Sequence, residues 1–543
     1  MQPEYDWQYL TEPQQHSNNR QYAWPRGKVL GGSSALNFLV WQRGAAQEFD
    51  AWEKMGPNPG WGWKSLQEYF KKSATMLPPS TQLQKDNFAT IEPEMHGSDG
   101  PVEVSFSAWY TEPQKHWINA MKTLGLNSNV DGLRGDNSGV WTSPATLDQK
   151  TWKRSYSASA HYEPNRHLPN FKVLTAAHAK RILLTEEGGE KRATGVEFFH
   201  DGKTYTVKAR KEIVLSGGTV NSPALLELSG IGSPEVVKAA GVEPQVELPG
   251  VGRNLQEHMY CTASFELKEG FTTWDSMGKP EFAATAMETY RGQGGDKGIL
   301  ASAFSGFAFL PLQKYLSQDE IKQIKDEAQE KIDDKTYYAN EAERESAREF
   351  LAQLGDESIP QMEAIFAPGY FATASAPKPG KNYMSILMAI QHPFSRGEIH
   401  ITSDDALKPP RIDPRYFSVK GDLQIMAKAI KWCDEIAASS SLKDLIVRRQ
   451  DPDPEKYKTE KDFEEFVKDY AVTEYHHLGT CCMMPKDKGG VVDGRLRVHG
   501  VKGLRVADAS IAPLMPSSHI QAVVYAIAEK GATLILEDLG LAH

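Results

Sequence analysis

Residues 26–44 read RGKVLGGSSALNFLVWQRG, and this glycine-rich stretch decides the fold. Gly31 and Gly32 carry no Cβ, so the backbone there can come close to a bound group. Ser33 or Ser34 can then cap a helix whose first N–H groups point at that group. A helix N-terminus of this kind suits an anion such as a pyrophosphate. The stretch therefore predicts one wall of an anion-binding site.

A second glycine-rich block, GGTVNSPALLELSGIG at residues 217–232, follows the apolar run EIVLS. The run predicts a strand, and Asn221, Ser222 and Pro223 are placed to cap and start the helix PALLELSG. A strand, a glycine turn and a helix N-terminus together form the wall of a nucleotide cofactor site. Either block alone is as often a plain turn, so the interpretation depends on further motifs.

Two more blocks complete the set, LPGVGRNLQEH at 248–258 and GLRVADASIAPLMPSSHIQAVVYAIAEKG at 503–531. With them the chain resembles the glucose-methanol-choline (GMC) family of FAD-dependent alcohol oxidoreductases, nearest in pattern to its aryl-alcohol oxidase-like members. The resemblance covers nearly the whole chain, and residues 270–385 are the least recognisable part. It implies an α/β fold (α+β overall), in which a FAD-binding domain is interleaved with a substrate domain built on an antiparallel sheet with helices.

The length of 543 residues exceeds one ordinary hydrophobic core, so we expect two closely joined domains. The expected parts are 1–260, most of the FAD-binding domain; 261–385, a substrate-domain segment with charged helices; and 386–543, which holds the substrate sheet and the end of the FAD domain. Residues 313–350 are highly charged with helical spacing. They predict a solvated helical pair, with a partner-binding surface as the alternative.

Periodicity predicts several elements outside the motifs. Residues 100–106 alternate as a strand, and residues 153–160 are expected to form a helix that leads toward a return strand. Residues 193–216 predict successive strands, with Asp201 and Gly202 as a hairpin turn. Strand-like apolar runs surround a turn at 385–401.

Composition excludes several partners. A formal net charge of −10 disfavours nucleic acid and anionic membrane surfaces. No run of 18 apolar residues exists, so we expect no membrane span. Four cysteines are too few for a disulfide framework, and without a C-x-x-C spacing we predict no metal site. The expected partners are a small-molecule alcohol and an electron acceptor, either oxygen or a quinone.

The dinucleotide fingerprint G-x-G-x-x-G does not occur in the chain. Relatives open with this βαβ unit, so we expect the chain to begin downstream of it, through a short gene model, an alternative start or a real truncation. Any targeting signal would be lost with that unit, so localisation stays unknown; the absence of Asn-x-Ser/Thr sequons leans toward an intracellular protein.

The chemistry is expected near the C-terminus, where residues 474–480 read EYHHLGT. The resemblance implies that His476 is the catalytic base and that His519, in PSSHIQA, is its catalytic partner. One imidazole can take the hydroxyl proton while the other hydrogen-bonds the oxygen as hydride leaves the carbon. We expect structural roles for His477, His258 and His392.

The resemblance also assigns contacts to FAD, at Val29, Gly32, Asn37, Phe38, Ala179, Asp508, Ala509 and Gln521. Leu36 stands where some relatives carry a histidine bonded to FAD, so we expect a noncovalent cofactor. Phe38 and Tyr475 align with aromatic positions of aryl-alcohol oxidases and would favour a benzylic or polyunsaturated primary alcohol by stacking. Alternatively, both rings only pack against the flavin.

The predicted function is therefore FAD-dependent oxidation of a primary alcohol to the aldehyde. An alternative follows from the absent G-x-G-x-x-G unit: a flavin-free cyclase or isomerase of the same fold, or an inactive binding protein.

Overall fold

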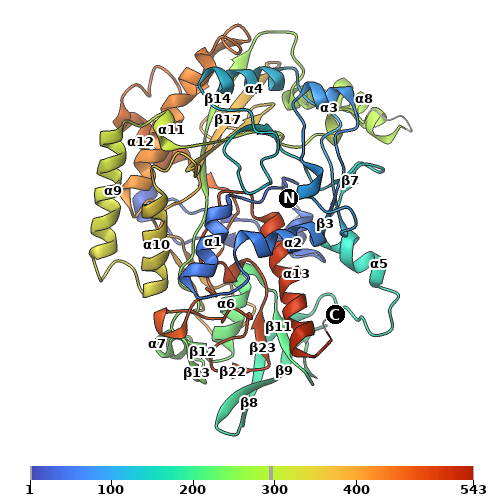
Figure 1. Cartoon of the computed structure of the whole chain (residues 1–543), viewed down its shortest axis with the longest axis vertical. Helices are drawn as coiled ribbons and strands as arrows, with labels where there is room; N and C mark the ends of the chain where they lie inside the picture. The colour runs from blue at the N-terminus through green and yellow to red at the C-terminus, as the bar shows by residue number, and fades with distance from the viewer. Residues whose placement is uncertain (1–2, 293–296, 542–543) are drawn as a thin grey trace.

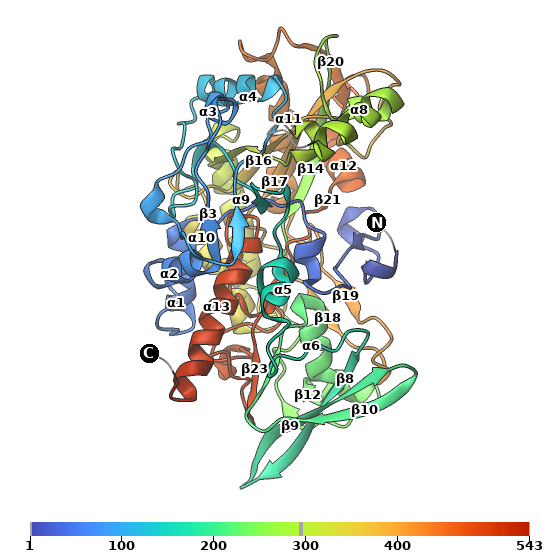
Figure 2. The same cartoon turned by 90° about the vertical axis from the view of Figure 1, so that its right-hand side faces the viewer.

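The computed structural model of the chain describes residues 3–292 and 297–541. Its two parts are stacked along the long axis (Figure 1). The large sheet that contains β14 and β17 lies in the upper half, and β8, β9, β11 and β23 lie with α6 in the lower half. The same division is visible after a 90° turn (Figure 2).

The upper sheet has seven strands in the order β20-β14-β17-β16-β15-β5, and β21 pairs with β14. Every pairing in it is antiparallel. The four strands β14 to β17 are buried along their whole length, which explains why they read as apolar runs rather than as alternating patterns. The strands are β5 (Gly139–Thr142), β14 (Met259–Leu267), β15 (Gly306–Leu310), β16 (Met362–Ala367), β17 (Tyr383–Ile390), β20 (Ile446–Asp451) and β21 (Val472–Thr473).

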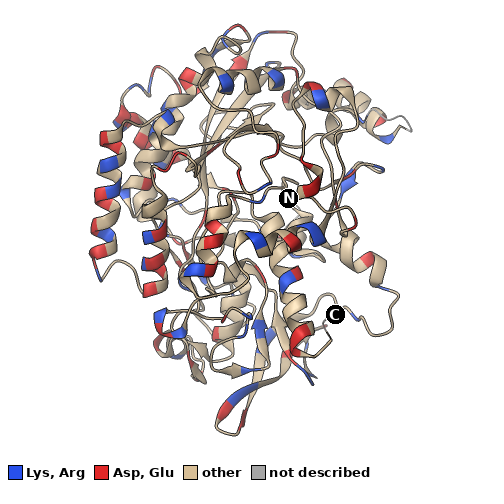
Figure 3. Cartoon of the chain, in the orientation of Figure 1, with Lys and Arg blue, Asp and Glu red and all other residues tan. Residues whose placement is uncertain are grey.

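Helices cover this sheet. Helix α11 (Lys420–Ala438) packs against β14 and β17, and α12 (Glu460–Tyr470) packs against α11. The predicted charged pair is confirmed as α9 (Gln318–Asp333) and α10 (Glu341–Gln353). Acidic and basic residues follow one another along both helices (Figure 3), while a stripe of apolar residues on α9 faces the protein.

The lower half contains the cofactor-side strands. A four-stranded sheet joins β8 (His178–Glu187), β9 (Glu190–His200), β10 (Lys203–Lys208) and β22 (Val501–Lys502). Beside it, β11 (Ile213–Leu215) pairs in parallel with β23 (Leu504–Val506). Six strands of the upper sheet lie between β11 and β23 in the sequence, so the predicted interleaving of the two domains is confirmed.

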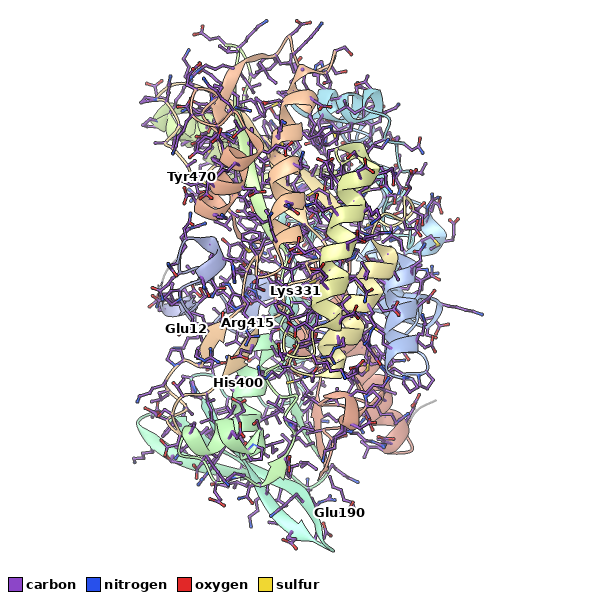
Figure 4. The ribbon with its side chains drawn as sticks, turned by 90° about the vertical axis from the view of Figure 1, so that its left-hand side faces the viewer. Glu12, Glu190, Lys331, His400, Arg415 and Tyr470 are labelled. Carbon is purple, nitrogen blue, oxygen red and sulfur yellow. The ribbon has the colours of Figure 1, made fainter. Side chains whose placement is uncertain are left out.

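Two hairpin turns shape the edge of this lower sheet. Asp201 and Gly202 have φ of 47° and 73° and connect β9 to β10, which confirms the predicted hairpin. The β8–β9 hairpin projects from the protein, and Figure 4 shows Glu190 at its tip, far from Tyr470 at the end of α12.

The second glycine block forms α6 (Gly218–Leu228), which begins earlier than predicted. Pro223 lies inside the helix instead of starting it, so its missing N–H leaves the carbonyl of Thr219 without an intrahelical donor. The Thr480 hydroxyl donates to that carbonyl at 2.7 Å. Asn221 does not cap the helix, because its side-chain oxygen accepts a hydrogen bond from Tyr9.

Two other predicted helices were wrong. Residues 32–35 form one 3₁₀ turn, Gly32–Ala35, and neither serine caps it. Their hydroxyls stay within the loop: Ser33 accepts from the Gly27 N–H and Ser34 donates to the Gly31 carbonyl. Residues 153–160 form the short strand β7 (Lys153–Arg154) and the start of a π-helix, Ala158–Tyr162.

The remaining helices of the described residues include α1 (Ala46–Met55), α2 (Trp63–Ser73), α3 (Gln82–Asp86), α4 (Pro113–Thr123), α5 (Glu163–Asn165), α7 (Pro234–Ala239), α8 (Pro280–Arg291) and α13 (Gln521–Asp538). The remaining strands include β1 (Tyr9–Leu10), β2 (Ala23–Trp24), β3 (Ala74–Met76), β4 (Val102–Val104), β6 (Leu147–Asp148), β12 (Ile231–Gly232), β13 (Val246–Glu247), β18 (Glu398–His400) and β19 (Arg411–Asp413). Strand β4 confirms the prediction for residues 100–106.

Both expected domain boundaries, after residues 260 and 385, fall inside strands of the upper sheet, and the division itself stays a prediction. All four cysteines are buried and free. Over residues 3–292 and 297–541, no helix is long and apolar enough to cross a membrane.

Candidate active site

The segment that carries His476 has a strained backbone. Tyr475 has a φ of 65°, a left-handed conformation that a bulky residue adopts only when its surroundings impose it. Two hydrogen bonds hold it there. The Tyr475 N–H donates to the Thr473 hydroxyl at 2.9 Å, and Arg26 donates to the Tyr475 carbonyl at 2.8 Å. Arg26 opens the glycine-rich stretch, so the first motif directly supports the segment that carries His476.

The buried carboxylate of Glu257 fixes the same segment from the other side. It accepts hydrogen bonds from the Thr473 hydroxyl at 2.6 Å, the His476 N–H at 3.0 Å and the Tyr416 hydroxyl at 2.8 Å. His477 also donates to it through Nδ1. These four hydrogen bonds point two consecutive histidines in opposite directions, His476 toward the site and His477 toward the core.

His477 is held in the core. Its ring stacks on Trp24 with centroids 3.5 Å apart and an interplanar angle of 6°. Burial lowers the pKa of His477 to about 4, so the ring is neutral near pH 7. These contacts agree with the structural role predicted for it.

His476 and His519 are brought together although 43 positions separate them in sequence (519 − 476). Their ring centroids lie 4.6 Å apart at an interplanar angle of 77°. The His519 N–H donates to the Gln42 side chain at 3.1 Å, and Phe307 on β15 packs edge-on against the His519 ring at 5.5 Å. The predicted pair thus lies between the first motif and the upper sheet.

A chain of hydrogen bonds determines the tautomer of His476. The Nε2 of His258 lies 3.0 Å from the carbonyl oxygen of Gln391, which can only accept, so this nitrogen carries a hydrogen. Burial lowers the pKa of both His258 and His476 well below the usual value, so both rings are neutral. The Nδ1 of His258 must then accept from the Nδ1 of His476, 3.0 Å away. The Nε2 of His476 is left with a free lone pair.

His258 therefore belongs to the site, which sequence reasoning missed. Its place directly after Glu257 in LQEH was the available signal, because both side chains approach the EYHHLGT segment. His392 lies apart from the pair, hydrogen-bonded to Glu48 at 2.8 Å and to Gln361 at 3.0 Å.

Two buried glutamates also face the histidines, and sequence reasoning missed both. Glu474 lies two positions before His476, and Glu363 lies on β16. Possible ligand atoms of Glu363, Glu474 and His519 lie within 4.8 Å of one another, and so do those of His258, Glu474 and His476. The prediction that the chain holds no metal remains a prediction.

The cofactor residues predicted from the motifs converge from separate parts of the chain. Asn37 donates to Gln521 at the start of α13 and accepts from Arg154 at 2.6 Å. Asp508 accepts from the Gly218 N–H at 2.9 Å and from the Ser222 hydroxyl at 2.6 Å. The contact between Asn37 and Gln521 joins the first signature to the last. The contacts of Asp508 join the second signature to the last.

The surfaces of these segments leave room for a bound group. Gly32 and Gly218 have φ of 56° and 76°, and a Cβ built on either would meet no atom within 4 Å. Phe38 is 50% exposed, Val29 and Ala509 are partly buried, and Ala179 lies exposed on β8. Open glycines beside exposed apolar groups fit a large planar cofactor that covers them.

An aromatic cluster adjoins this wall. Phe38 meets Phe304 edge-on at 5.6 Å and Phe371 at 6.3 Å, and Trp274 packs on Phe304 at 4.9 Å. Tyr260 lies 6.5 Å from Phe371. Sequence reasoning paired Phe38 with Tyr475 and missed the other rings, which come from the least recognisable part of the chain and from β14.

The comparisons with known proteins agree with this geometry. The family description "GMC oxidoreductase" matches residues 13–260 and 393–528. The chain belongs to the GMC oxidoreductase family. It is 34% identical over 537 residues to the GMC oxidoreductase family protein Mala s 12 of Malassezia sympodialis, covering 98% of this chain and 83% of that protein.

Two solved structures are similar. A FAD-dependent oxidoreductase from Chaetomium thermophilum has a TM-score of 0.90 at 28% identity, covering 99% of this chain and 91% of that one. A fungal aryl-alcohol oxidase has a TM-score of 0.88 at 24% identity, covering 98% and 90%, and so supports the fold alone. As a GMC oxidoreductase the chain is a FAD-dependent oxidoreductase, and the flavin-free alternative is not favoured.

We expect Glu257→Gln to lower the free energy of unfolding by about 2–4 kcal/mol, because an amide cannot accept from all four donors and leaves some of them buried without a partner. Urea denaturation of the FAD-loaded protein measures this. Glu94→Gln, at an exposed position, serves as the control. Equal midpoints for both variants would show that Glu257 does not hold the segment.

Proposed function

We propose that this GMC oxidoreductase oxidises a primary alcohol, preferably a benzylic one, to the aldehyde. The free lone pair on Nε2 of His476, fixed by the hydrogen bond of its Nδ1 to His258, carries the proposal. A neutral imidazole held in one tautomer beside a second imidazole is suited to take a hydroxyl proton.

The two histidines have different roles in this proposal. His476 removes the hydroxyl proton at Nε2, and His519, whose ring lies beside it, hydrogen-bonds the substrate oxygen. FAD, when bound, accepts the hydride from the alcohol carbon. The residues that would hold FAD are Val29, Gly32, Asn37, Phe38, Ala179, Asp508, Ala509 and Gln521. Leu36 offers no nucleophile, so we propose noncovalent binding. The electron acceptor is oxygen or a quinone.

The aromatic cluster supports the substrate class. Phe38, Phe304 and Phe371 meet one another at near-perpendicular angles of 76° to 87°. Phe38 exposes half of its surface, so one ring of the cluster is free to contact a ligand. Aromatic rings favour other rings over hydroxyl-rich sugars, because each stacked or edge-on pair contributes roughly 0.5–1.5 kcal/mol.

His476→Ala should lower kcat by roughly two to four powers of ten at unchanged flavin content, because it removes the base. Burial, and then the neighbouring His519, lowers the pKa of His476 well below the usual value for histidine. Wild-type kcat/KM should therefore fall only at a pH below that usual pKa, where His476 becomes protonated. Steady-state rates and the flavin absorbance of each preparation measure both effects. His167→Ala, at an exposed histidine, serves as the control. Near-normal turnover in flavin-replete His476→Ala would refute the assignment.

Benzyl alcohol should have a higher kcat/KM than glucose or choline, and Phe38→Ala should reduce that preference by roughly twofold to tenfold. Tyr205→Ala, at an exposed aromatic residue on β10, is the matched control. A clear preference for a sugar would mean that these rings only pack against the flavin.

A further inference from the structure

Two buried carboxyl groups lie against the histidine pair and have no part in the chemistry described so far. The side chain of Glu363 is fully buried, and that of Glu474 is 5% exposed. Burying a charged carboxylate is unfavourable unless partners compensate its charge, so two such groups side by side require an explanation.

Glu474 faces both catalytic histidines. Its Oε1 lies 3.4 Å from Nε2 of His519, and its Oε2 lies 3.7 Å from Nδ1 of His476. The same Oε2 is 3.7 Å from Nδ1 of His258. Glu363 approaches from β16, with Oε1 3.2 Å from Nε2 of His519. A charge on this pair would therefore act on whichever imidazole becomes protonated.

Three of the four carboxyl oxygens of Glu363 and Glu474 have no hydrogen-bond donor among the described residues. Both oxygens of Glu474 and Oε1 of Glu363 are buried without a hydrogen-bond partner among the described residues, while Oε2 of Glu363 accepts from Gln391 at 3.2 Å. Ionised carboxylates can only accept, whereas a protonated carboxyl can donate to its neighbour. One proton held between the two groups would give two of these three oxygens a partner, and adjacent carboxylates cannot both ionise easily.

The electrostatics agree with a retained proton. Burial raises the pKa of Glu363 to about 8. Burial, and then the neighbouring Glu363, raises the pKa of Glu474 well above its usual value. Burial lowers the pKa of His519, and the neighbouring Glu474 offsets part of this effect.

We propose that Glu363 and Glu474 share one proton, and that the single negative charge left on the pair stabilises the imidazolium formed when His476 takes the alcohol proton. This inference rests on the proposed function. In the proton transfer, the O–H bond of the alcohol breaks and an Nε2–H bond forms on His476. The hydride leaves the carbon as the C=O bond forms, and FAD, when bound, would accept it. The positive charge on His476 is then balanced by the carboxyl pair. The two glutamates touch the histidines and are positioning residues.

The groups that face the pair come from five segments. These are Gln42 in the first motif, His258 before β14, Gln391 after β17, His476 after β21 and His519 before α13. Glu257 adds a more distant negative charge that also raises the pKa of Glu474. Among the described residues, neither carboxyl forms an ion pair with a lysine or arginine, so a histidine that gains a proton would be the cation beside them.

The test is Glu474→Gln in the FAD-loaded enzyme. The amide keeps the shape of the side chain, but the remaining negative charge moves to Glu363, which contacts His519 and not His476. His476 therefore loses the anion beside it and becomes a weaker base, so kcat should fall roughly tenfold to a hundredfold. Losing an anion lowers a histidine pKa, so the acidic limb of the pH profile of kcat/KM should move down by about one unit or more. Glu363→Gln should not move the limb down, because the negative charge then stays on Glu474, the carboxyl group beside His476.

Glu343→Gln is the matched control, since Glu343 is buried on α10 outside the cluster. It should leave the acidic limb in place. A fall in kcat without movement of the limb in Glu474→Gln would reveal a merely structural role and overturn the proposal.

A second readout does not depend on turnover. In protein labelled with ¹⁵N-histidine, the ring resonances of His476, assigned with His476→Ala, should titrate at lower pH in Glu474→Gln than in the wild type. If alcohols are not oxidised but this shift occurs, the proposed function fails and the carboxyl pair stands. If alcohols are oxidised and neither the shift nor the limb movement occurs, the pair fails and the function stands. One equivalent of a chelatable divalent metal in the active protein would also overturn the pair, because its oxygens would then be ligands.

Discussion

The buried carboxylate of Glu257 is the interaction on which the site depends. It joins the segment before β14 to the segment after β21, and its donors include the backbone of His476 and the side chain of His477. A buried charge of this kind is stable only when several donors surround it. Arg26, which holds the Tyr475 carbonyl, brings the first glycine motif into the same arrangement. The strained conformation of Tyr475 is thus maintained by contacts from two distant parts of the chain, and it directs two adjacent histidines to opposite sides.

Around the segment that Glu257 holds, three histidines of the same chemistry take three different roles. His258 accepts one hydrogen and thereby fixes the lone pair of His476, while His519 stands beside it against two carboxyl groups. Each imidazole differs in function because of its neighbours and not because of its own chemistry. The antiparallel sheet supplies Glu363 and the rings near the substrate side, and the cofactor half supplies the open glycines. The interleaved chain is what allows both halves to meet at one pair of side chains.

Sequence reasoning predicted the fold class, the pairing of His476 with His519 in space and the hairpin at Asp201, because local motifs and periodicity determine these features. It did not find His258, Glu363 or Glu474 as parts of the site. Their positions follow from the register of β14, β16 and β21, and sheet register across a hundred residues leaves no local signal. The helix expected at Ser33 failed for a related reason: hydroxyls that can cap a helix can also bond within their own loop. The start of α6 was misplaced because a tertiary contact from Thr480 compensates for Pro223.

The central claim is that His476 takes a hydroxyl proton while hydride leaves the alcohol carbon. The most direct measurement is the rate at which the absorbance of oxidised flavin disappears when anaerobic enzyme is mixed with benzyl alcohol, compared with benzyl alcohol deuterated at the reacting carbon. The account predicts complete bleaching of the flavin, with a clearly slower rate for the deuterated substrate, because the C–H bond breaks in the step that reduces the flavin. Absence of bleaching, or equal rates for the two alcohols, would contradict it.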